Sequence, residues 1–539
     1  MNVVETKFHG PADRRSALDR AHRGDILGAF GSVASHDTEP RRGLRRRLST
    51  LAAIAGPGVV VLVAGNDAGG VSVYAQAGQD HGLRLLWVLL LLAPVLFVNQ
   101  EMAARLGAVT GAGHARLIFE RFGRVWGAFA FGDLLVLNLF TAATDFFGMN
   151  LALGYLGINR YVAIPAAVVL LIAVASAGGY RRWERAMCAM VAVDLLLVPL
   201  ALLVHGPQHP SPVATLHGTA PNAVFLVIAL VGTTATPWQL FLQQSSVVDK
   251  RVTARWVAYA RLDTALGTAA MVLGAAVVMV VCATAFDGTA LAGRFTDAGA
   301  VARGLRLTSG GAAAAIFAVV LLNASMLGAA AVTLSSAYAV GDVLGVKHSL
   351  HRRWADGATF RIVFVLTIGA AALFALVPAV PVGLITTSVQ ALAGVLLPSA
   401  SVFLLLLCND PVVLGPRTNP RWLNALGALA VGVFVVLSAQ LMVTTALPRL
   451  DARALLVVLG GVGAVFFVAW GVVLAIDDRR RGQLRGRGWW ERKTWTMPAI
   501  ESLSTPSLTR GRRFGLVLLR GYLLLAAAAI VAKIVGLAL

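Results

Sequence analysis

Long apolar stretches separated by short polar or basic segments dominate the chain. A helix that crosses a membrane needs about 20 mostly apolar residues, and the sequence contains thirteen stretches of this kind. They are residues 51–80, 85–104, 125–154, 161–179, 184–204, 221–247, 257–285, 311–343, 360–379, 381–407, 423–446, 454–476 and 514–538. The pattern predicts an all-α integral membrane protein.

Basic residues are distributed unevenly among the segments between these spans. With the N-terminus in the cytoplasm, 37 of the 46 Lys and Arg residues fall on the cytoplasmic side and 7 on the opposite side. Cytoplasmic loops of membrane proteins carry an excess of this kind. We therefore expect a multi-pass protein of the cell membrane with a cytoplasmic N-terminus and, after thirteen spans, an extracellular C-terminus.

The spans divide the chain into three parts. Residues 1–50 are polar and Arg-rich, and we expect a disordered cytoplasmic tail whose run at 41–47 contacts lipid headgroups. Residues 51–446, which hold spans 1–11, form the predicted core. Residues 447–539 contribute two peripheral helices joined by a basic cytoplasmic loop at 477–513.

Composition excludes several function classes. Hydrophobic residues make up 58% of the chain and charged residues 13%, against about 45–50% and about 25% in soluble domains. The net charge of +20 is accounted for by the loops, so we expect the lipid bilayer and no nucleic acid as a partner. The chain has no phosphate-binding Gly-x-x-x-x-Gly-Lys-Ser/Thr loop and no His-Glu-x-x-His motif. We therefore expect no enzyme activity, no ATP hydrolysis and no resident cofactor.

Two of the spans contain residues that interrupt a helix. In the first span, residues 65–70 read Gly-Asn-Asp-Ala-Gly-Gly, which is a poor helix-forming run. In the sixth span, Pro237 follows Gly232 after a run of small and polar residues, and a proline cannot donate its backbone hydrogen bond. Unwound backbone at membrane depth is tolerated where protein buries it or where it lines a watery cavity.

The spacing of the two breaks carries topological information. They lie five helices apart, and five is odd, so spans 1–5 and 6–10 would form two units of opposite topology. This pattern is typical of transporters with 5+5 inverted repeats and a substrate site between two discontinuous helices. Two unrelated kinks in a helical bundle are the alternative. Asp67 favours the transporter, because a carboxylate inside the membrane is costly and usually serves a ligand or a pathway.

At these residues the chain resembles the natural-resistance-associated macrophage protein (NRAMP) family of divalent-metal transporters. The resemblance rests on motifs that occur in the family's order over residues 50–445. These are Asp67-Ala-Gly-Gly70, Leu106-Gly-Ala-Val-Thr-Gly111, Ala143-Thr-Asp145, Arg181-Arg-Trp-Glu184, Thr236-Pro-Trp238, Arg261-Leu-Asp-Thr264 and Gln390 before Pro398. The resemblance implies a LeuT-like fold with about three additional C-terminal helices.

The resemblance also implies a cation site between the two breaks. Its ligands would come from Asp67, Gly69 and Gly70 in the first break and from Thr233 and Thr236 in the second. Trp238, Gln243 and Gln390 would form the cavity wall or hydrogen-bond to groups around the ion, and Asp145 would line an inner vestibule. An ion pair with Arg361 is the alternative for Asp145.

Departures from the family pattern change the expected ion. The family's Asn in the first break is Gly70 here, and its Met in the sixth helix is Thr236. Oxygen ligands favour Mg²⁺ and Mn²⁺ over softer ions, and Mg²⁺ usually keeps several waters when bound. The pattern is similar to that of the NRAMP-related magnesium transporters, so we expect import of largely hydrated Mg²⁺, and of Mn²⁺, by alternating access.

The same comparison bears on proton coupling and on alternatives. The family's two sixth-helix histidines are Trp238 and Gln243 here, and its third-helix Glu is Gly148. A proton relay uses Asp, Glu or His at depth. The chain keeps Asp145 but lacks these neighbours, so we expect weak or absent proton coupling. A proton-coupled Mn²⁺/Fe²⁺ transporter of the same family, and an amino-acid or amine transporter on the same fold, are the alternative functions.

Overall fold

A computed structural model describes residues 22–446 apart from 38, 177, 206–219, 354 and 379, together with scattered positions between 455 and 521. Within this part of the chain, nine helices are long and apolar enough to cross a membrane, or ten if one bent pair counts as a span. The helical membrane protein predicted from the sequence is confirmed. The predicted spans at 454–476 and 514–538 lie outside the described residues.

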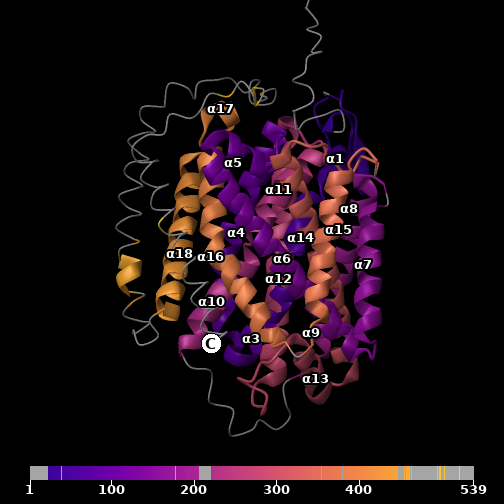
Figure 1. The fold of residues 1–539 in the computed structure, drawn as a ribbon, viewed down its shortest axis with the longest axis vertical. Helices are drawn as coiled ribbons and strands as arrows, with labels where there is room; N and C mark the ends of the chain where they lie inside the picture. The colour runs from indigo at the N-terminus through magenta and orange to yellow at the C-terminus, as the bar shows by residue number, and fades with distance from the viewer. Residues whose placement is uncertain are drawn as a thin grey trace, which may run out of the picture.

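Most helices run along the long axis of one bundle (Figure 1). Their bounds are α1 Leu44–Ile54, α2 Pro57–Val63, α3 Ala68–His81, α4 Leu86–Thr110, α5 His114–Phe122, α6 Arg124–Tyr155, α7 Arg160–Ser176, α8 Tyr180–Val193, α9 Leu197–Leu203, α10 Ala220–Thr234, α11 Pro237–Asp249, α12 Val257–Phe286, α13 Ala298–Thr308, α14 Gly311–Leu344, α15 Ala358–Leu376, α16 Val382–Cys408, α17 Pro411–Leu414 and α18 Arg421–Ala446. Helices α1, α5 and α17 lie near one end of the bundle, and α13 lies at the other.

The first predicted span is interrupted twice. Helices α1 and α2 meet at a bend of 52°, where Gly56 has φ +148°, a conformation that favours glycine. The second interruption, between α2 and α3, covers residues 64–67. It is shorter than the predicted break at 65–70, because α3 already begins at Ala68 and takes the two following glycines into its first turn.

The second predicted break is also confirmed and is also shorter. Helix α10 ends at Thr234 and α11 begins at Pro237, so only Ala235 and Thr236 lie between the two helices. A proline fits the first position of a helix because its missing N–H is unpaired there anyway. Pro237 therefore starts a helix, and Gly232 remains inside α10.

A small hairpin covers one end of the bundle. Strands β1 (Ile26–Gly28) and β2 (Gly31–Val33) pair antiparallel, and at the turn the Ala29 N–H donates to Glu184 of α8 at 2.7 Å. The structure thus differs from the predicted disordered tail over the hairpin and α1. The basic composition of the tail hid it, because the hairpin is stabilised by contacts with α8 rather than by a core of its own.

Buried charges hold the start of α2 against the rest of the bundle. Both carboxylate oxygens of Asp263 on α12 accept backbone N–H groups at the start of α2, from Gly56, Gly58 and Val59, at 2.6–3.2 Å. Lys250 makes an ion pair of 2.6 Å with Glu184 and donates to the Ala55 carbonyl at 2.8 Å. The acids of two motifs that the sequence singled out therefore anchor this half-helix.

Candidate functional site

Asp67 lies at the first break and caps the helix that follows. Its side chain accepts a hydrogen bond from the Gly70 N–H at 2.8 Å, which makes it the N-cap of α3, and only 1% of the residue is exposed. An acid in this position satisfies a free N–H group and favours the positive end of the helix dipole. The break thus holds a buried carboxylate in a fixed place.

Asp145 on α6 faces the same break. The Ala68 N–H donates to Asp145 Oδ1 at 3.1 Å, next to Asp67. A Cβ atom added to Gly328 of α14 would lie 2.5 Å from the Asp67 Cβ and 2.8–2.9 Å from the two Asp145 oxygens. Both acids therefore converge on one glycine.

The structure places Asp145 beside the first break, and its role in lining an inner vestibule stays a prediction. The alternative partner, Arg361 on α15, donates instead to the carbonyls of Ala175 and Arg352, each at 2.8 Å. The sequence could not show that the two acids converge, because Ala68, the residue next to Asp67, and Asp145 are 77 residues apart in the chain.

Gln390 on α16 reaches the first turn of α3. A Cβ atom on Gly69 would overlap the side-chain amide of Gln390. A Cβ atom on Gly232 of α10 would overlap the backbone carbonyl oxygen of Gln390. The two glycines thus let α16 approach both discontinuous helices. Gly69 and Gly70 lie in the first turn of α3, where helix carbonyl oxygens accept hydrogen bonds from the following turn. Their role as cation ligands stays a prediction.

Of the two predicted threonines, Thr233 lies at the end of α10 and Thr236 lies in the second break. Thr233 Oγ1 would lie 3.0 Å from a Cβ atom on Gly70, so it faces the start of α3. Thr236 forms a capping box with Gln239 at the start of α11, and its N–H donates to Gln239 Oε1 at 3.1 Å. Its hydroxyl also donates to the Thr233 carbonyl at 3.4 Å. Thr236 is thus engaged in local capping, whereas Thr233 faces the first break.

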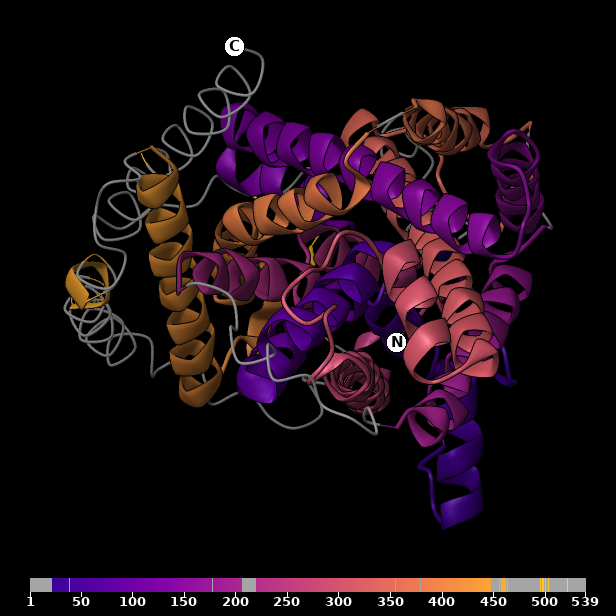
Figure 2. The same ribbon diagram turned by 90° about the horizontal axis from the view of Figure 1, so that it is seen from below.

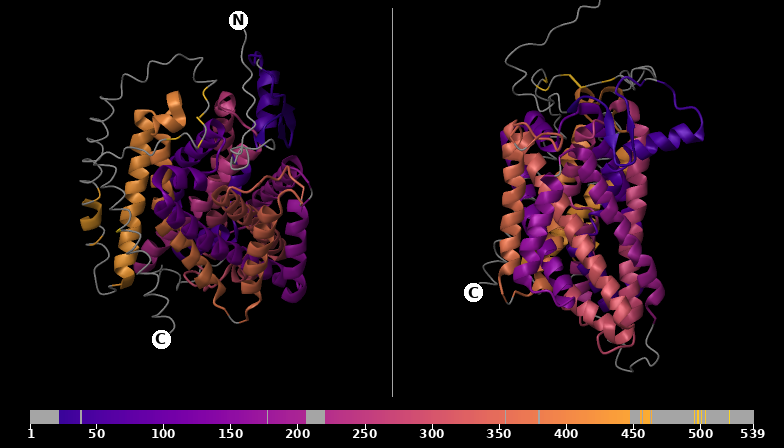
Figure 3. Two further views of the ribbon diagram at one scale, coloured as in Figure 1. Left: turned by 45° about the horizontal axis from the view of Figure 1, so that its top comes forward. Right: turned by 90° about the vertical axis from the view of Figure 1, so that its right-hand side faces the viewer.

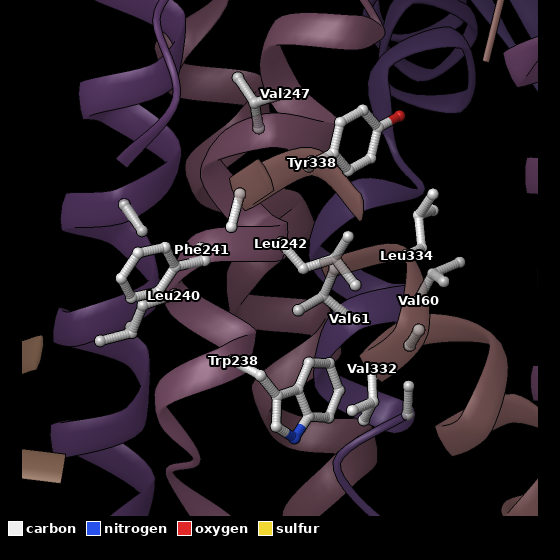
Figure 4. Close-up of a cluster of buried hydrophobic side chains, with 14 of the residues drawn as sticks. Val60, Val61, Trp238, Leu240, Phe241, Leu242, Val247, Val332, Leu334 and Tyr338 are labelled. Carbon is white, nitrogen blue, oxygen red and sulfur yellow. The ribbon is translucent and has the colours of Figure 1, made fainter. Parts of the chain in front are cut away.

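Trp238, near the start of α11, packs with residues of α2 and α14. Figure 4 shows its indole beside Val332, in an apolar cluster that also includes Val60 and Val61 of α2 and Leu242 of α11. The tryptophan is fully buried, and its carbonyl accepts from Ser335 Oγ at 3.1 Å. Trp238 therefore belongs to an apolar cluster that begins directly after the second break, and its role as a cavity wall stays a prediction.

Gln243 lies on α11, beyond the second break. It follows Pro237 by six residues on one continuous helix, which places it roughly 9 Å along the axis at 1.5 Å per residue. It is fully buried, and both of its side-chain amide atoms make no hydrogen bond with another described protein group. Its role at the cavity stays a prediction, whereas Asp67, Asp145, Thr233 and Gln390 lie around the first turn of α3.

Several groups at the break were missed by the sequence reasoning. Gln239 is one, because a Cβ atom on Gly65 would overlap its side-chain amide, so this residue connects the two breaks. Met271 on α12 also reaches the break, with its terminal methyl 2.9 Å from the same Cβ position. The sequence could have indicated Gln239, because a Gln three residues after a Thr is a capping-box pattern. No sequence pattern indicates Gly328 or Met271.

Many polar atoms around the breaks make no hydrogen bond with another described protein group. They are Asn66 Oδ1, Asp145 Oδ2, Thr233 Oγ1, Trp238 Nε1, Gln239 Nε2 and both side-chain amide atoms of Gln390. Buried polar groups in proteins are nearly always paired, and an unpaired one is costly. This concentration of unpaired donors and acceptors is suited to a polar ligand that brings its own water.

Two other intramembrane acids have different neighbours. Asp194 accepts from the Asn323 side chain at 2.7 Å. Asp133 lines a small cavity with Pro237, the first residue of α11, and with Phe241 and Ser399. Among the described residues, no group of three or more His, Cys, Asp or Glu side chains has metal-site geometry. The break therefore holds two carboxylates together with neutral amides and hydroxyls.

Comparison with known sequences gives consistent matches. Residues 58–444 match the family described as natural resistance-associated macrophage protein-like. A divalent metal cation transporter of Lacticaseibacillus casei is 24% identical over 418 residues, which are 74% of this chain and 90% of that protein. One from Pseudomonas aeruginosa is 27% identical over 73% of this chain and 91% of its own length. One from Verminephrobacter eiseniae is 33% identical, but the match spans only half of its length.

Solved structures match the same architecture. The manganese transporter of Eremococcus coleocola, in complex with an aromatic bis-isothiourea compound, has a TM-score of 0.60 at 19% identity and covers 83% of this chain and 98% of its own. This likeness concerns the fold, which is LeuT-like. Because the family match extends over most of its length, the chain belongs to the natural resistance-associated macrophage protein-like family, whose members are membrane transporters and not enzymes.

Proposed function

We propose that the protein imports Mg²⁺, and with it Mn²⁺, as a largely hydrated ion by alternating access. The broader assignment, a divalent metal cation transporter, rests on its family and its relatives. The substrate would bind at the first break, between Asp67 and Asp145. We place the protein in the cell membrane with the N-terminal hairpin in the cytoplasm, as the distribution of basic residues indicates.

One observation carries the proposal, namely that Asp67 and Asp145 converge on Gly328 beside an unwound segment. Two buried carboxylates repel each other and lose the stabilisation that water gives them. A divalent cation between them would neutralise both charges. Carboxylates are ligands that Mg²⁺ and Mn²⁺ prefer, and Mg²⁺ is commonly bound through one or two of them while it keeps several waters.

The neutral groups around the acids fit a hydrated ion. Gln239 and Gln390 each present an unpaired side-chain amide nitrogen, and Thr233 an unpaired hydroxyl. Such groups cannot replace a carboxylate as ligands, but they hydrogen-bond to waters in the ion's first shell. The site would therefore recognise the ion together with its water, which suits an ion that dehydrates reluctantly.

The electrical potential would drive this transport. Moving two charges across 100 mV is worth about 4.6 kcal/mol. The position of the family's third-helix Glu is Gly148, where an added Cβ would overlap Ala68 and Ser325, so a longer side chain there would not fit beside the break. With neutral Trp238 and Gln243 at the two histidine positions, we propose transport without fixed proton stoichiometry.

Flux measurements in proteoliposomes test this function. We expect Mg²⁺ uptake that rises with an inside-negative potential, competition by Mn²⁺, and no acidification of the lumen beyond that of protein-free vesicles. Vesicle acidification in fixed proportion to Mg²⁺ uptake would contradict the proposed mechanism. Absence of Mg²⁺ uptake alongside robust Mn²⁺ uptake would contradict the proposed substrate.

A proton-coupled Mn²⁺/Fe²⁺ transporter is the second candidate. Met271 favours it, since its side chain reaches Gly65 in the first break and thioethers bind softer ions. If this candidate were correct, Met271→Leu would lower Mn²⁺ or Fe²⁺ uptake while Mg²⁺ competed poorly. In the magnesium mechanism, Met271→Leu changes Mg²⁺ uptake little, because a leucine fills about the same space.

A carboxylate-bearing substrate such as an amino acid fits the site less well. In discontinuous-helix transporters, the positive end of a half-helix faces the anionic group of such a substrate. Here the Asp67 carboxylate already accepts the Gly70 N–H at the start of α3. The capping acid would repel a substrate carboxylate at the same place.

A further inference from the structure

Helix α1 extends away from the bundle instead of packing into it. It joins α2 at a bend of 52°, and Figures 2 and 3 show the dark indigo N-terminal region projecting sideways at one end of the molecule. Its outer half, residues 44–49, is exposed throughout. In a membrane-spanning bundle, an element that projects sideways at one end lies over the surrounding lipid.

The helix has a buried face that docks on the hairpin. Thr50, Ala53 and Ile54 are buried, and a Cβ on Gly31 of β2 would lie 3.2 Å from the Ala53 Cβ. These contacts fix the rotation of α1 about its own axis. The faces that remain are therefore presented in a defined direction.

A leucine stripe occupies one of these remaining faces. Leu44, Leu48 and Leu51 follow each other at spacings of four and three, so they share one side of the helix. Leu44 is 73% exposed and Leu48 is 54% exposed. Large apolar side chains exposed in a row on a helix outside the transmembrane bundle indicate a surface that another apolar phase covers.

Two arginines flank the stripe. Arg45, Arg46 and Arg47 are all exposed, and at 3.6 residues per turn Arg45 and Arg47 lie on either side of the leucines, whereas Arg46 lies on the opposite side. There Arg46 pairs with Glu39 at 3.0 Å, with both side chains more than half exposed. Such a surface pair contributes little and exchanges readily for another anion. The helix thus combines exposed leucines with available cationic groups, the pattern of helices that lie in a membrane interface.

We propose that α1 lies in the headgroup layer of the bilayer and binds anionic phospholipid. The leucine stripe would enter the boundary between headgroups and acyl chains, and Arg45 and Arg47, which flank it, would contact lipid phosphates. The positive charge of the arginines favours an anionic surface as their partner. The sideways projection of the helix places that surface in the membrane rather than on a soluble partner.

This contact has a mechanical consequence. Helix α1 leads directly into α2, the half-helix that ends at the first break and whose first N–H groups Asp263 holds. Anionic lipid would therefore restrain the element that borders the candidate site. The lipid contact itself does not depend on which cation the protein carries, so it can be tested separately from the proposed function.

Spin labels on full-length protein in nanodiscs test the proposal. In a Cys188→Ala background, a nitroxide on Leu48→Cys reports the stripe, and one on Ser49→Cys, which lies off the stripe, is the matched control. Cys282 and Cys408 are buried and would not be labelled. Collision with oxygen, which concentrates in lipid, is compared with collision with a water-soluble nickel chelate.

For the label at position 48, we compare the ratio of oxygen collisions to nickel collisions in two kinds of nanodisc. We expect this ratio to be about threefold higher when roughly a quarter of the lipid is phosphatidylglycerol than when all of it is phosphatidylcholine. The label at 49 should remain accessible to nickel. Changing Arg45, Arg46 and Arg47 together to Gln should abolish the lipid dependence. Equal nickel access at 48 and 49 in both lipids would overturn the proposal. So would burial of position 48 that depends on protein concentration, which would indicate a second copy of the chain.

Discussion

At the scale of single residues, Asp67 has two roles that are chemically compatible. It caps α3 through the Gly70 N–H, and it faces Gly328 together with Asp145. A carboxylate has lone pairs for both tasks, because one oxygen can accept an N–H while the other faces a ligand. An asparagine in its place would retain the cap and lose the charge.

Gly328 gives a residue-scale prediction. An added methyl group would lie 2.5 Å from the Asp67 Cβ and within 2.9 Å of both Asp145 oxygens, so Gly328→Ala should displace the carboxylates and lower uptake by about tenfold or more. Overpacking of this kind costs about 1–3 kcal/mol. Gly311→Ala on the same helix is the matched control, since its Cβ would meet nothing within 4 Å. Equal uptake by both variants would show that the carboxylates need no close approach at Gly328.

At the scale of elements, the start of α2 depends on buried charge. Lys250 and Glu184 are both fully buried, Ala29 in the hairpin donates to the same glutamate, and Asp263 holds the first N–H groups of the helix. Buried charges thus anchor the start of α2, and the Asp67 cap lies just beyond the other end of α2, at the start of α3. Movement of α2 during transport would have to exchange these contacts.

Breaking the buried pair should destabilise the protein. Lys250→Met leaves the Glu184 charge uncompensated, which costs about 3–5 kcal/mol, and adding Glu184→Gln should restore part of that loss. Arg46→Gln, which breaks an exposed pair, should cost less than about 1 kcal/mol. Thermal unfolding of the purified protein measures all three. A Lys250→Met variant as stable as Arg46→Gln would contradict the anchoring role.

The loop between α14 and α15 gives a pH-dependent prediction. Burial disfavours the charged form of His348, but its 3.0 Å ion pair with Asp342 outweighs burial and raises the pKa of His348. A histidine whose pKa rises on folding stabilises the fold below its unfolded pKa of about 6.5, and this contribution is lost as pH increases through the folded pKa. Thermal stability should therefore fall as pH rises above about 6.5, and His348→Gln should flatten that fall.

His351 in the same loop is the matched control for this prediction. Burial lowers the pKa of His351, so it is neutral over most of this range and its contribution has the opposite sign. His351→Gln should retain the loss of stability above pH about 6.5. A His348→Gln variant with the full slope would assign the pH dependence to other groups.

At the scale of the whole molecule, the sequence predicts the bundle better than the site. The length of the apolar runs is set by the thickness of the bilayer, and the basic loops by the side of the membrane on which they lie. The membrane-spanning helices could therefore be predicted without knowledge of tertiary contacts. Gly65 and Pro237 marked the existence of the breaks, but the caps formed by Asp67 and Thr236 determine their ends. The hairpin was hidden because its stability comes from contacts with a distant helix.

The site could be predicted only where its chemistry is local. Asp67 is recognisable as an acid in a run of poor helix formers, whereas the position of Asp145 depends on how α6 packs against the start of α3. Gly328 carries no signal in the sequence, because a glycine in an apolar helix has many explanations. Tertiary packing therefore supplied the second carboxylate, and with it the charge that suits a divalent cation.

The central claim is that Asp67 and Asp145 together bind the transported cation, and Mg²⁺ uptake at a fixed inside-negative potential tests it most directly. Asp67→Asn and Asp145→Asn should each lower uptake by about tenfold to a hundredfold, the equivalent of losing a charged contact of about 1.5–3 kcal/mol. Asp194→Asn, an acid elsewhere in the bundle that pairs with Asn323, should transport normally. Wild-type uptake by either of the first two variants, in folded protein, would contradict the account.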